Sequence, residues 1–180
     1  RLLSILASIV ALSCTAEPLP KTVTFAEHIA PIIFDNCVEC HRPGEAAPFS
    51  LTTFHSTRKR ARTIRRVTDD GYMPPWHPVE GHGEFKDSRR LSDRQLQLLD
   101  RWVETGMKEG DPSQTPAVPT FPAGWRLGTP DLVVKMPKAF AVPADGPDIY
   151  RNFVVPLDLP GDKWVIGVEV RPSARPVVHH

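Results

Sequence analysis

The sequence predicts a mainly α-helical domain, followed after a linker by the first part of an all-β sandwich. Up to about residue 110, apolar residues recur at helical spacing behind capping residues. Between 111 and 126 prolines replace this pattern, and from 127 onward short β-rich runs alternate with proline or glycine turns. We therefore divide the chain into residues 1–16, 17–110, 111–126 and 127–180.

Composition limits the classes of partner. The 22 Lys and Arg against 21 Asp and Glu give a net charge of +1, which creates no global field for nucleic acid, so we expect no nucleic-acid partner. The 20 prolines in 180 residues predict many turns and little long helix. Because the chain starts at Arg1 and ends directly after an apolar run, we expect it to be part of a longer protein.

The amino-terminal residues have the pattern of a signal peptide. Arg1 precedes an uncharged run over 2–12, followed by small residues that end at Ala16. A spanning helix needs about 20 apolar residues, whereas a signal peptide needs roughly 7 to 15. We expect cleavage after Ala16, a periplasmic or otherwise exported protein, and no spanning segment in the mature chain. The alternative is a lipid anchor at Cys14, since the residues before it loosely resemble a lipoprotein box.

The first predicted helix leads to a cysteine pair. Thr24 and Glu27 have the spacing of a capping box. Apolar side chains behind them fall close to one helical face: Phe25, Ile29, Ile32 and Ile33.

Two further helices are predicted. The second covers 53–67, with an inner edge formed by Ala61, Ile64 and Val67. The third begins at Ser92, is capped by Gln95 and ends at Gly106. Its apolar stripe consists of Leu96, Leu99, Trp102 and Val103.

The run Cys37-Val38-Glu39-Cys40-His41 is the most informative motif. C-x-x-C-H is the spacing of c-type haem attachment, in which two thiols add to the porphyrin vinyl groups and the histidine binds the iron. A structural disulfide, a thioredoxin-like redox pair and half of a zinc site are the alternatives. A zinc site lacks a second cysteine pair, and a redox pair lacks its βαβ setting. The motif therefore favours haem c on Cys37, Cys40 and His41.

Met73 is the predicted second axial ligand of the iron. It lies about thirty residues after His41, just before Pro74 and Pro75, which stiffen the loop. His77 is the second choice. Other residues that could reach iron are His28, His55, His82, Met107 and Met136. Histidine and methionine ligation fills both axial positions and raises the potential relative to two histidines, so it predicts electron transfer.

One dense basic cluster has two interpretations. It consists of Arg58, Lys59, Arg60, Arg62, Arg65 and Arg66. These residues form either a solvated helix face, or a surface that neutralises haem propionates or steers an acidic redox partner. The sequence does not decide between them.

These motifs resemble a known family. The stretches 24–44, Ala47-Pro48-Phe49 and Met73-Pro74-Pro75-Trp76 resemble the cytochrome c module at the front of certain exported bacterial proteins. There the module precedes a copper type II, ascorbate-dependent monooxygenase-like domain. The resemblance covers about residues 22–110 and implies a cytochrome c domain with three or more helices around the haem.

The residues after the linker carry a second resemblance. Runs at 130–134, 150–157 and 164–172, with the closing His179-His180 pair, resemble the first strands of the peptidylglycine and dopamine hydroxylating monooxygenases. The resemblance implies that His179 and His180 bind copper in the full-length protein, with the other ligands beyond residue 180. From the residues alone, the pair would be an exposed strand end or a cloning remnant.

The leading function is an exported c-type cytochrome that carries single electrons and serves a fused copper-dependent monooxygenase domain. Its partner would be a redox protein or a small-molecule reductant, and this chain alone would not be a competent enzyme. The alternatives are a haem c relay joined to a non-catalytic β-sandwich binding module, and a haem sensor with an open sixth position.

Overall fold

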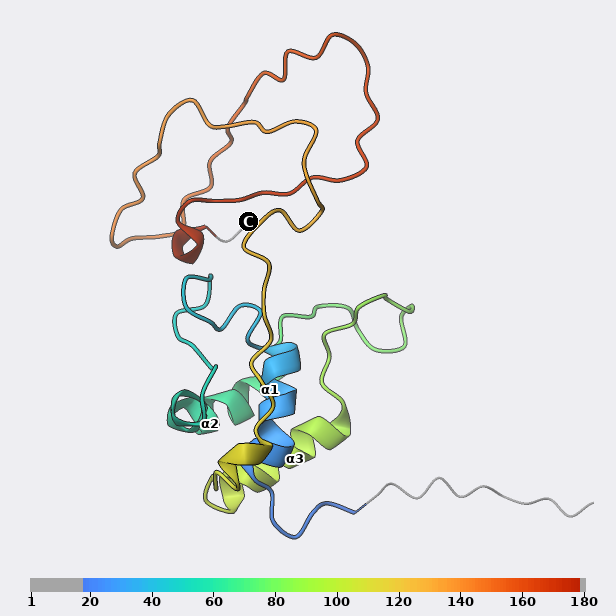
Figure 1. Ribbon diagram of the computed structural model, residues 1–180, viewed down its shortest axis with the longest axis vertical. Helices are drawn as coiled ribbons and strands as arrows, with labels where there is room; N and C mark the ends of the chain where they lie inside the picture. The colour runs from blue at the N-terminus through green and yellow to red at the C-terminus, as the bar shows by residue number, and fades with distance from the viewer. Residues whose placement is uncertain (1–17, 179–180) are drawn as a thin grey trace, which may run out of the picture.

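The computed structural model describes residues 18–178. Three α-helices, α1 (Ala30–Asn36), α2 (Phe54–Asp69) and α3 (Asp93–Glu104), pack at one end of the molecule, and looped chain after residue 126 lies at the other end (Figure 1). Shorter turns are η1 (Phe25–Ile29), η2 (Pro112–Gln114) and η3 (Arg175–Val177). Within these residues no helix is long and apolar enough to cross a membrane. The predicted signal peptide over 1–16, Cys14 and the His179-His180 pair lie outside the described residues.

The first helix forms, but the predicted capping box at Thr24 is wrong. Its side chain accepts no cap hydrogen bond. Instead, Thr24 Oγ1 donates to Glu27 Oε2 at 3.3 Å, and the Thr24 N–H donates to His28 Nδ1 at 3.2 Å. The turn that follows is the π-helical η1, in which the Ala30 N–H donates to the Phe25 carbonyl five residues back. This wider turn replaces the tight first turn that a capping box needs.

Local caps define the starts of α2 and α3. Thr53 Oγ1 accepts from the Ser56 N–H, and Ser56 Oγ accepts from the Thr53 N–H, both at 3.2 Å. At α3 the reciprocal bonds between Ser92 and Gln95 measure 3.3 and 2.8 Å, so the predicted cap is confirmed. Because these signals are local, the helices begin at the predicted positions. α3 also ends as predicted, just before Gly106, which has a φ of +92°.

The core joins the first and third helices. Trp102 is fully buried, its ring centroid lies 6.2 Å from that of Phe25, and its Nε1 donates to the Lys108 carbonyl at 2.9 Å. The same carbonyl accepts the Phe25 N–H at 2.9 Å. The cluster also contains Val23, Ile29, Ile33, Val38, Leu51, Ala61, Ile64, Leu91 and Leu99. The segment after α3 is thereby held against η1, at the amino end of α1.

The residue before the linker, Gly110, lies close to the Thr24 side chain. A Cβ on Gly110 would lie 2.7 Å from Thr24 Cβ, and Gly110 has a φ of +82°, so only glycine fits there without strain. Apart from the short turn η2, which packs against η1, the linker contains no helix, and it runs from the helical end of the molecule to the looped end (Figure 1). Phe121 near its end packs against the core.

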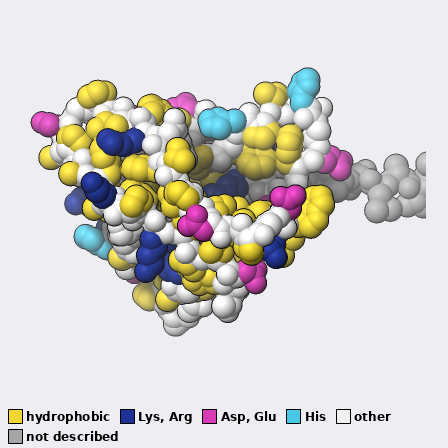
Figure 2. All heavy atoms as spheres, turned by 90° about the horizontal axis from the view of Figure 1, so that it is seen from above, with side chains coloured by type: hydrophobic (Ala, Val, Ile, Leu, Met, Phe, Trp, Pro, Cys, Tyr) yellow, Lys and Arg dark blue, Asp and Glu magenta, His cyan; other side chains and the backbone are white. Residues whose placement is uncertain are grey.

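The predicted partial β-sandwich at 127–180 is wrong. In the part of this region that the structure describes, 127–178, there is no strand and only the turn η3. Trp164 and Ile166, in the first half of a predicted strand, are 100% and 101% exposed. Figure 2, seen from this end of the molecule, shows hydrophobic side chains spread over the face. Alternating apolar residues form a strand only when a neighbour satisfies its backbone groups, and the eight prolines from Pro130 to Pro176 offer no N–H for that purpose.

Candidate functional site

The Cys-x-x-Cys-His motif forms one hydrogen-bonded turn at the carboxyl end of α1. The Cys37 N–H donates to the Ile33 carbonyl at 2.9 Å, and the N–H groups of Cys40 and His41 both donate to the Cys37 carbonyl, at 3.2 and 2.9 Å. Val38 is fully buried and anchors the turn in the core. Cys37 is half-buried and Cys40 is exposed. The turn therefore holds both thiols and the imidazole on one rigid segment.

The loop that follows orients the His41 ring. His41 Nδ1 lies 3.1 Å from the Phe49 carbonyl oxygen, and the two ring centroids are 4.7 Å apart. Because a carbonyl only accepts, Nδ1 carries the proton and Nε2 keeps its lone pair, which is the tautomer that binds a metal through Nε2. Burial lowers the pKa of His41, although the bond to Phe49 acts in the opposite direction. At neutral pH the ring is consequently uncharged, with Nε2 available to donate its lone pair to a metal.

The electrostatics of Cys37 disfavour a reactive redox pair. Burial, reinforced by the neighbouring Cys40, raises the pKa of the Cys37 thiol to about 12. Reactive Cys-x-x-Cys pairs instead have a nucleophile with a lowered pKa, often at a helix amino end. Cys37 follows a helix carboxyl end, where the helix dipole disfavours a thiolate. The two cysteines are also not joined in a disulfide.

The donor set fits a porphyrin better than a zinc ion. A structural zinc site needs four donors converging at about 2 Å. Within residues 18–178, no group of three or more His, Cys, Asp or Glu side chains is arranged to hold a metal ion. Haem c makes a different demand, since the thiols bond to the ring periphery while the imidazole alone reaches the iron. Cys37, Cys40 and His41 supply these three groups from one turn, and a haem bound to them stays a prediction.

Met73 lies at the carboxyl end of α2. Its N–H and that of Tyr72 both donate to the Val67 carbonyl at 2.9 Å, which fixes the start of the loop. The Met73 residue lines a cavity of about 250 Å³ together with Trp76, Leu91 and Leu96. None of Cys37, Cys40 and His41 lines this cavity. The structure thus brings the two thiols and His41 together but does not join Met73 to them, and its role as an iron ligand stays a prediction.

The other candidate histidines differ in setting. His28 is half-buried and accepts the Thr24 N–H, so it has a structural role at the start of η1. His55, His77 and His82 are exposed. Of these, His77 shares the loop of Met73 and stays the second choice.

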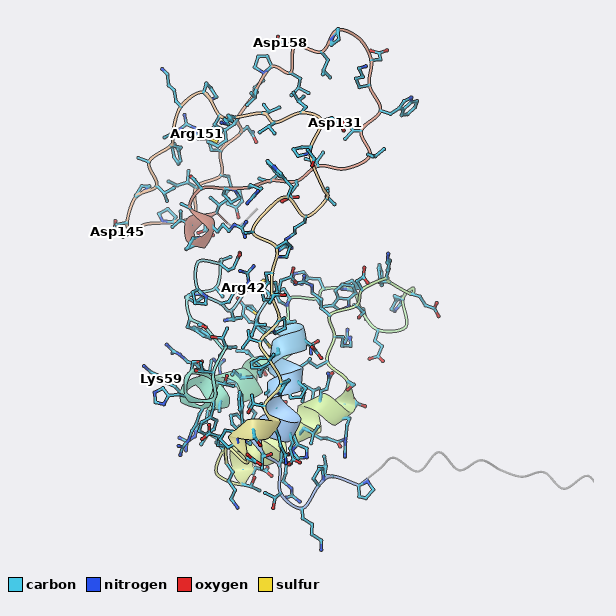
Figure 3. The ribbon with its side chains drawn as sticks, viewed as in Figure 1. Arg42, Lys59, Asp131, Asp145, Arg151 and Asp158 are labelled. Atoms are coloured by element: carbon cyan, nitrogen blue, oxygen red, sulfur yellow. The ribbon has the colours of Figure 1, made fainter. Side chains whose placement is uncertain are left out.

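The basic cluster lies mainly on the outer face of α2, opposite buried Ala61 and Ile64. Lys59, labelled in Figure 3, and Arg62 are exposed and form no ion pair with the described residues. Arg65 instead pairs with Asp100 and Glu104 of α3, and the Arg60 guanidinium lies 4.7 Å from the Phe49 ring centre. The cluster therefore combines a solvated face with side chains that support the His41 loop and the helix packing.

Sequence reasoning missed a set of ion pairs around the Cys-x-x-Cys-His turn. Glu39, between the two cysteines, accepts from Arg89 and Arg126, each at 2.9 Å. Glu45 pairs with Arg42 at 2.7 Å and also with Arg175. No sequence periodicity connects Glu39 and Glu45 with residues as distant as Arg126 and Arg175. The charge of Glu39 inside the motif is only a weak sequence signal of an ion pair.

Comparisons of this chain with models of protein families, with curated proteins and with solved structures found no match. The functional assignment therefore rests on the residues of the turn itself.

Proposed function

We propose that this chain is an exported c-type cytochrome that carries single electrons through a haem attached to Cys37 and Cys40. The observation that supports it is the turn after α1, which presents two thiols and a neutral imidazole. Its Nδ1 carries the proton, and its Nε2 forms no hydrogen bond with the residues that the structure describes. A bound haem supplies reversible one-electron exchange at its iron.

The chain's own residues have separate tasks in this proposal. Cys37 and Cys40 form the thioether bonds, His41 binds the iron through Nε2, and the Phe49 carbonyl keeps the ring in the right tautomer. Met73 is proposed as the second axial ligand. Export is supported by the signal-peptide pattern over 1–16. The electron partner is a redox protein or a small-molecule reductant.

The proposal does not depend on a copper domain. A copper domain is supported only by the family resemblance and by the His179-His180 pair, which lies outside the described residues. The predicted sandwich that would have carried the copper ligands is absent from residues 127–178. The alternative of a haem relay joined to a sandwich binding module loses its structural basis for the same reason.

A redox titration separates an electron carrier from a haem sensor. We expect the protein, produced in a host that attaches haem c, to be reduced and reoxidised reversibly by one electron per chain. We also expect the reduced protein to bind no carbon monoxide, because both axial positions are filled by side chains. Rapid binding of carbon monoxide to the wild-type protein would instead indicate an open sixth position and a sensor.

Replacing Met73 by alanine tests the second ligand. We expect the oxidised Met73→Ala protein to lose the weak near-infrared band of sulfur-to-iron ligation, and its reduction potential to fall, because a thioether ligand raises the potential. The matched variant is His77→Ala, in the same loop, which should keep both the band and the potential. Retention of the band in Met73→Ala would move the assignment to another residue.

A further inference from the structure

Two long-range ion pairs connect the Cys-x-x-Cys-His turn with the chain after the linker. Arg126 Nη1 lies 2.9 Å from Glu39 Oε1, across 87 residues of sequence. Arg175 donates from Nη1 to Glu45 Oε1, across 130 residues. Glu39 lies between the two cysteines and Glu45 follows the motif by four residues. Both carboxylates therefore belong to the segment that would hold the haem.

The pair at Glu45 is part of a shielded cluster. The Glu45 side chain is 13% exposed and that of Arg42 is 18% exposed, and the two are joined at 2.7 Å. The Arg42 guanidinium also lies 4.0 Å from the ring centre of Phe121, at the end of the linker. Figure 3 shows Arg42 at the junction between the helical part and the looped part of the molecule. Because water screens this cluster poorly, its charges interact more strongly than an exposed pair.

The residues that contact the turn are also joined to each other. The N–H groups of Arg126 and Leu127 donate to Glu169 Oε2 at 2.7 and 3.3 Å. Arg171 donates to the Ala123 carbonyl at 2.8 Å, and its guanidinium lies 4.8 Å from the Trp125 ring centre. Segments 121–127 and 169–175, which we call the docking segments, thus form one paired unit. This unit contacts the turn through Arg126, and the loop at 42–45 that follows the turn through Phe121 and Arg175.

A cavity of about 260 Å³ lies along the same junction. It is lined by Glu45 and Ala46 from the loop after the cysteines, and by Arg126, Arg175 and Val178 from the other side. Val178 is the last residue that the structure describes. The carboxyl end of the described chain therefore lies against the loop that follows the haem-attachment motif.

We infer that the turn bearing Cys37, Cys40 and His41, with the loop at 42–45 that follows it, is the docking surface for this chain's own docking segments, held there by Glu39, Arg42 and Glu45. These three are positioning residues, since they act on the placement of the post-linker chain. The docking itself is independent of haem. Its consequence rests on the proposed function: the docked segments cover one side of the haem-bearing turn, so an external electron partner must approach another face.

Hydrogen exchange of the full chain, measured by mass spectrometry, tests the docking. We expect Glu39→Gln with Glu45→Gln to speed amide exchange in the docking segments by roughly two- to tenfold, since both ion pairs to these segments, from Arg126 and Arg175, are lost. Lys163→Gln removes one charge from the same region without any contact to the turn, and should leave exchange unchanged. Exchange rates equal to wild type in the double variant would overturn the inference.

A double-mutant cycle tests whether Glu45 and Arg175 act as a pair. We expect Glu45→Gln and Arg175→Gln each to speed exchange of the docking segments, and the combined variant to exchange at most slightly faster than Glu45→Gln alone. Effects that simply multiply would show two independent residues and would contradict the pairing.

The reduction potential gives a readout that a general loss of stability would not produce. Arg126→Gln with Arg175→Gln should lower the haem potential, because nearby cations favour the reduced iron, whereas Lys163→Gln should not. An unchanged potential in the arginine double variant would contradict docking beside the haem. If the chain attaches no haem but the Glu39 and Glu45 substitutions still speed exchange in the docking segments, the proposed function alone is refuted. If the chain carries haem and these substitutions leave exchange unchanged, the docking alone is refuted.

Discussion

A chain in which both Cys37 and Cys40 are replaced by alanine is expected to lose all haem that resists acid–acetone extraction. The wild-type protein, matured in the same host, should keep its colour in the protein pellet. The reason is covalent: without a sulfur at either position no thioether can form, and a haem held only by its axial ligands leaves when acid protonates His41. The measurement is the haem absorbance of the pellet after extraction, per mole of protein.

Two controls make this result specific. Each single variant, Cys37→Ala and Cys40→Ala, retains one thiol and should keep part of the colour. Met136→Ala removes an exposed sulfur from the chain after the linker and should behave as wild type. Since Cys40 is exposed and Cys37 only half-buried, the double variant should keep its helical circular dichroism. Wild-type colour that leaves entirely with the solvent would contradict thioether attachment.

Replacing Trp102 by alanine is expected to lower the free energy of unfolding by about 3 to 5 kcal/mol. The side chain belongs to α3 and is fully buried against Phe25 of η1, and its indole donates to the Lys108 carbonyl. The substitution leaves a cavity, and Lys108 loses a hydrogen bond that holds the end of α3 to η1. Urea unfolding followed by helical circular dichroism measures the effect.

Trp164→Ala is the matched control for that experiment. Trp164 is 100% exposed, so its removal should change the free energy of unfolding by no more than about 0.5 kcal/mol. Trp102→Phe should fall between the two, because it keeps an aromatic ring but not the N–H donor. If Trp102→Ala cost no more than Trp164→Ala, the helical core would not be organised around this residue.

The helices were predictable because their signals are local. Ser92 and Gln95 satisfy each other's backbone groups three residues apart, and the buried stripe of α3 follows directly. At Thr24 the same kind of pattern failed, since the π-helical turn η1 alters the geometry of the cap. The local rule holds only where the helix that follows has an ordinary first turn.

The region after residue 126 was not predictable in the same way. The alternation around Trp164 and Ile166 describes residues able to form a strand, but strand formation depends on a partner elsewhere in space. The motif at Cys37–His41 was readable because its chemistry lies in five consecutive residues. The ion pairs of Glu39 and Glu45 were not, because Arg126 and Arg175 approach only in the folded chain.

Peptide mapping by mass spectrometry tests the central claim most directly. The full chain, produced in a host that attaches haem c, is denatured and digested, and the peptide that contains Cys37, Cys40 and His41 is weighed and fragmented. We predict that this peptide carries the mass of one haem and has no alkylatable thiol. The same peptide recovered at its unmodified mass, or two hydrogens lighter as a disulfide, would contradict the assignment of this turn as a haem c site.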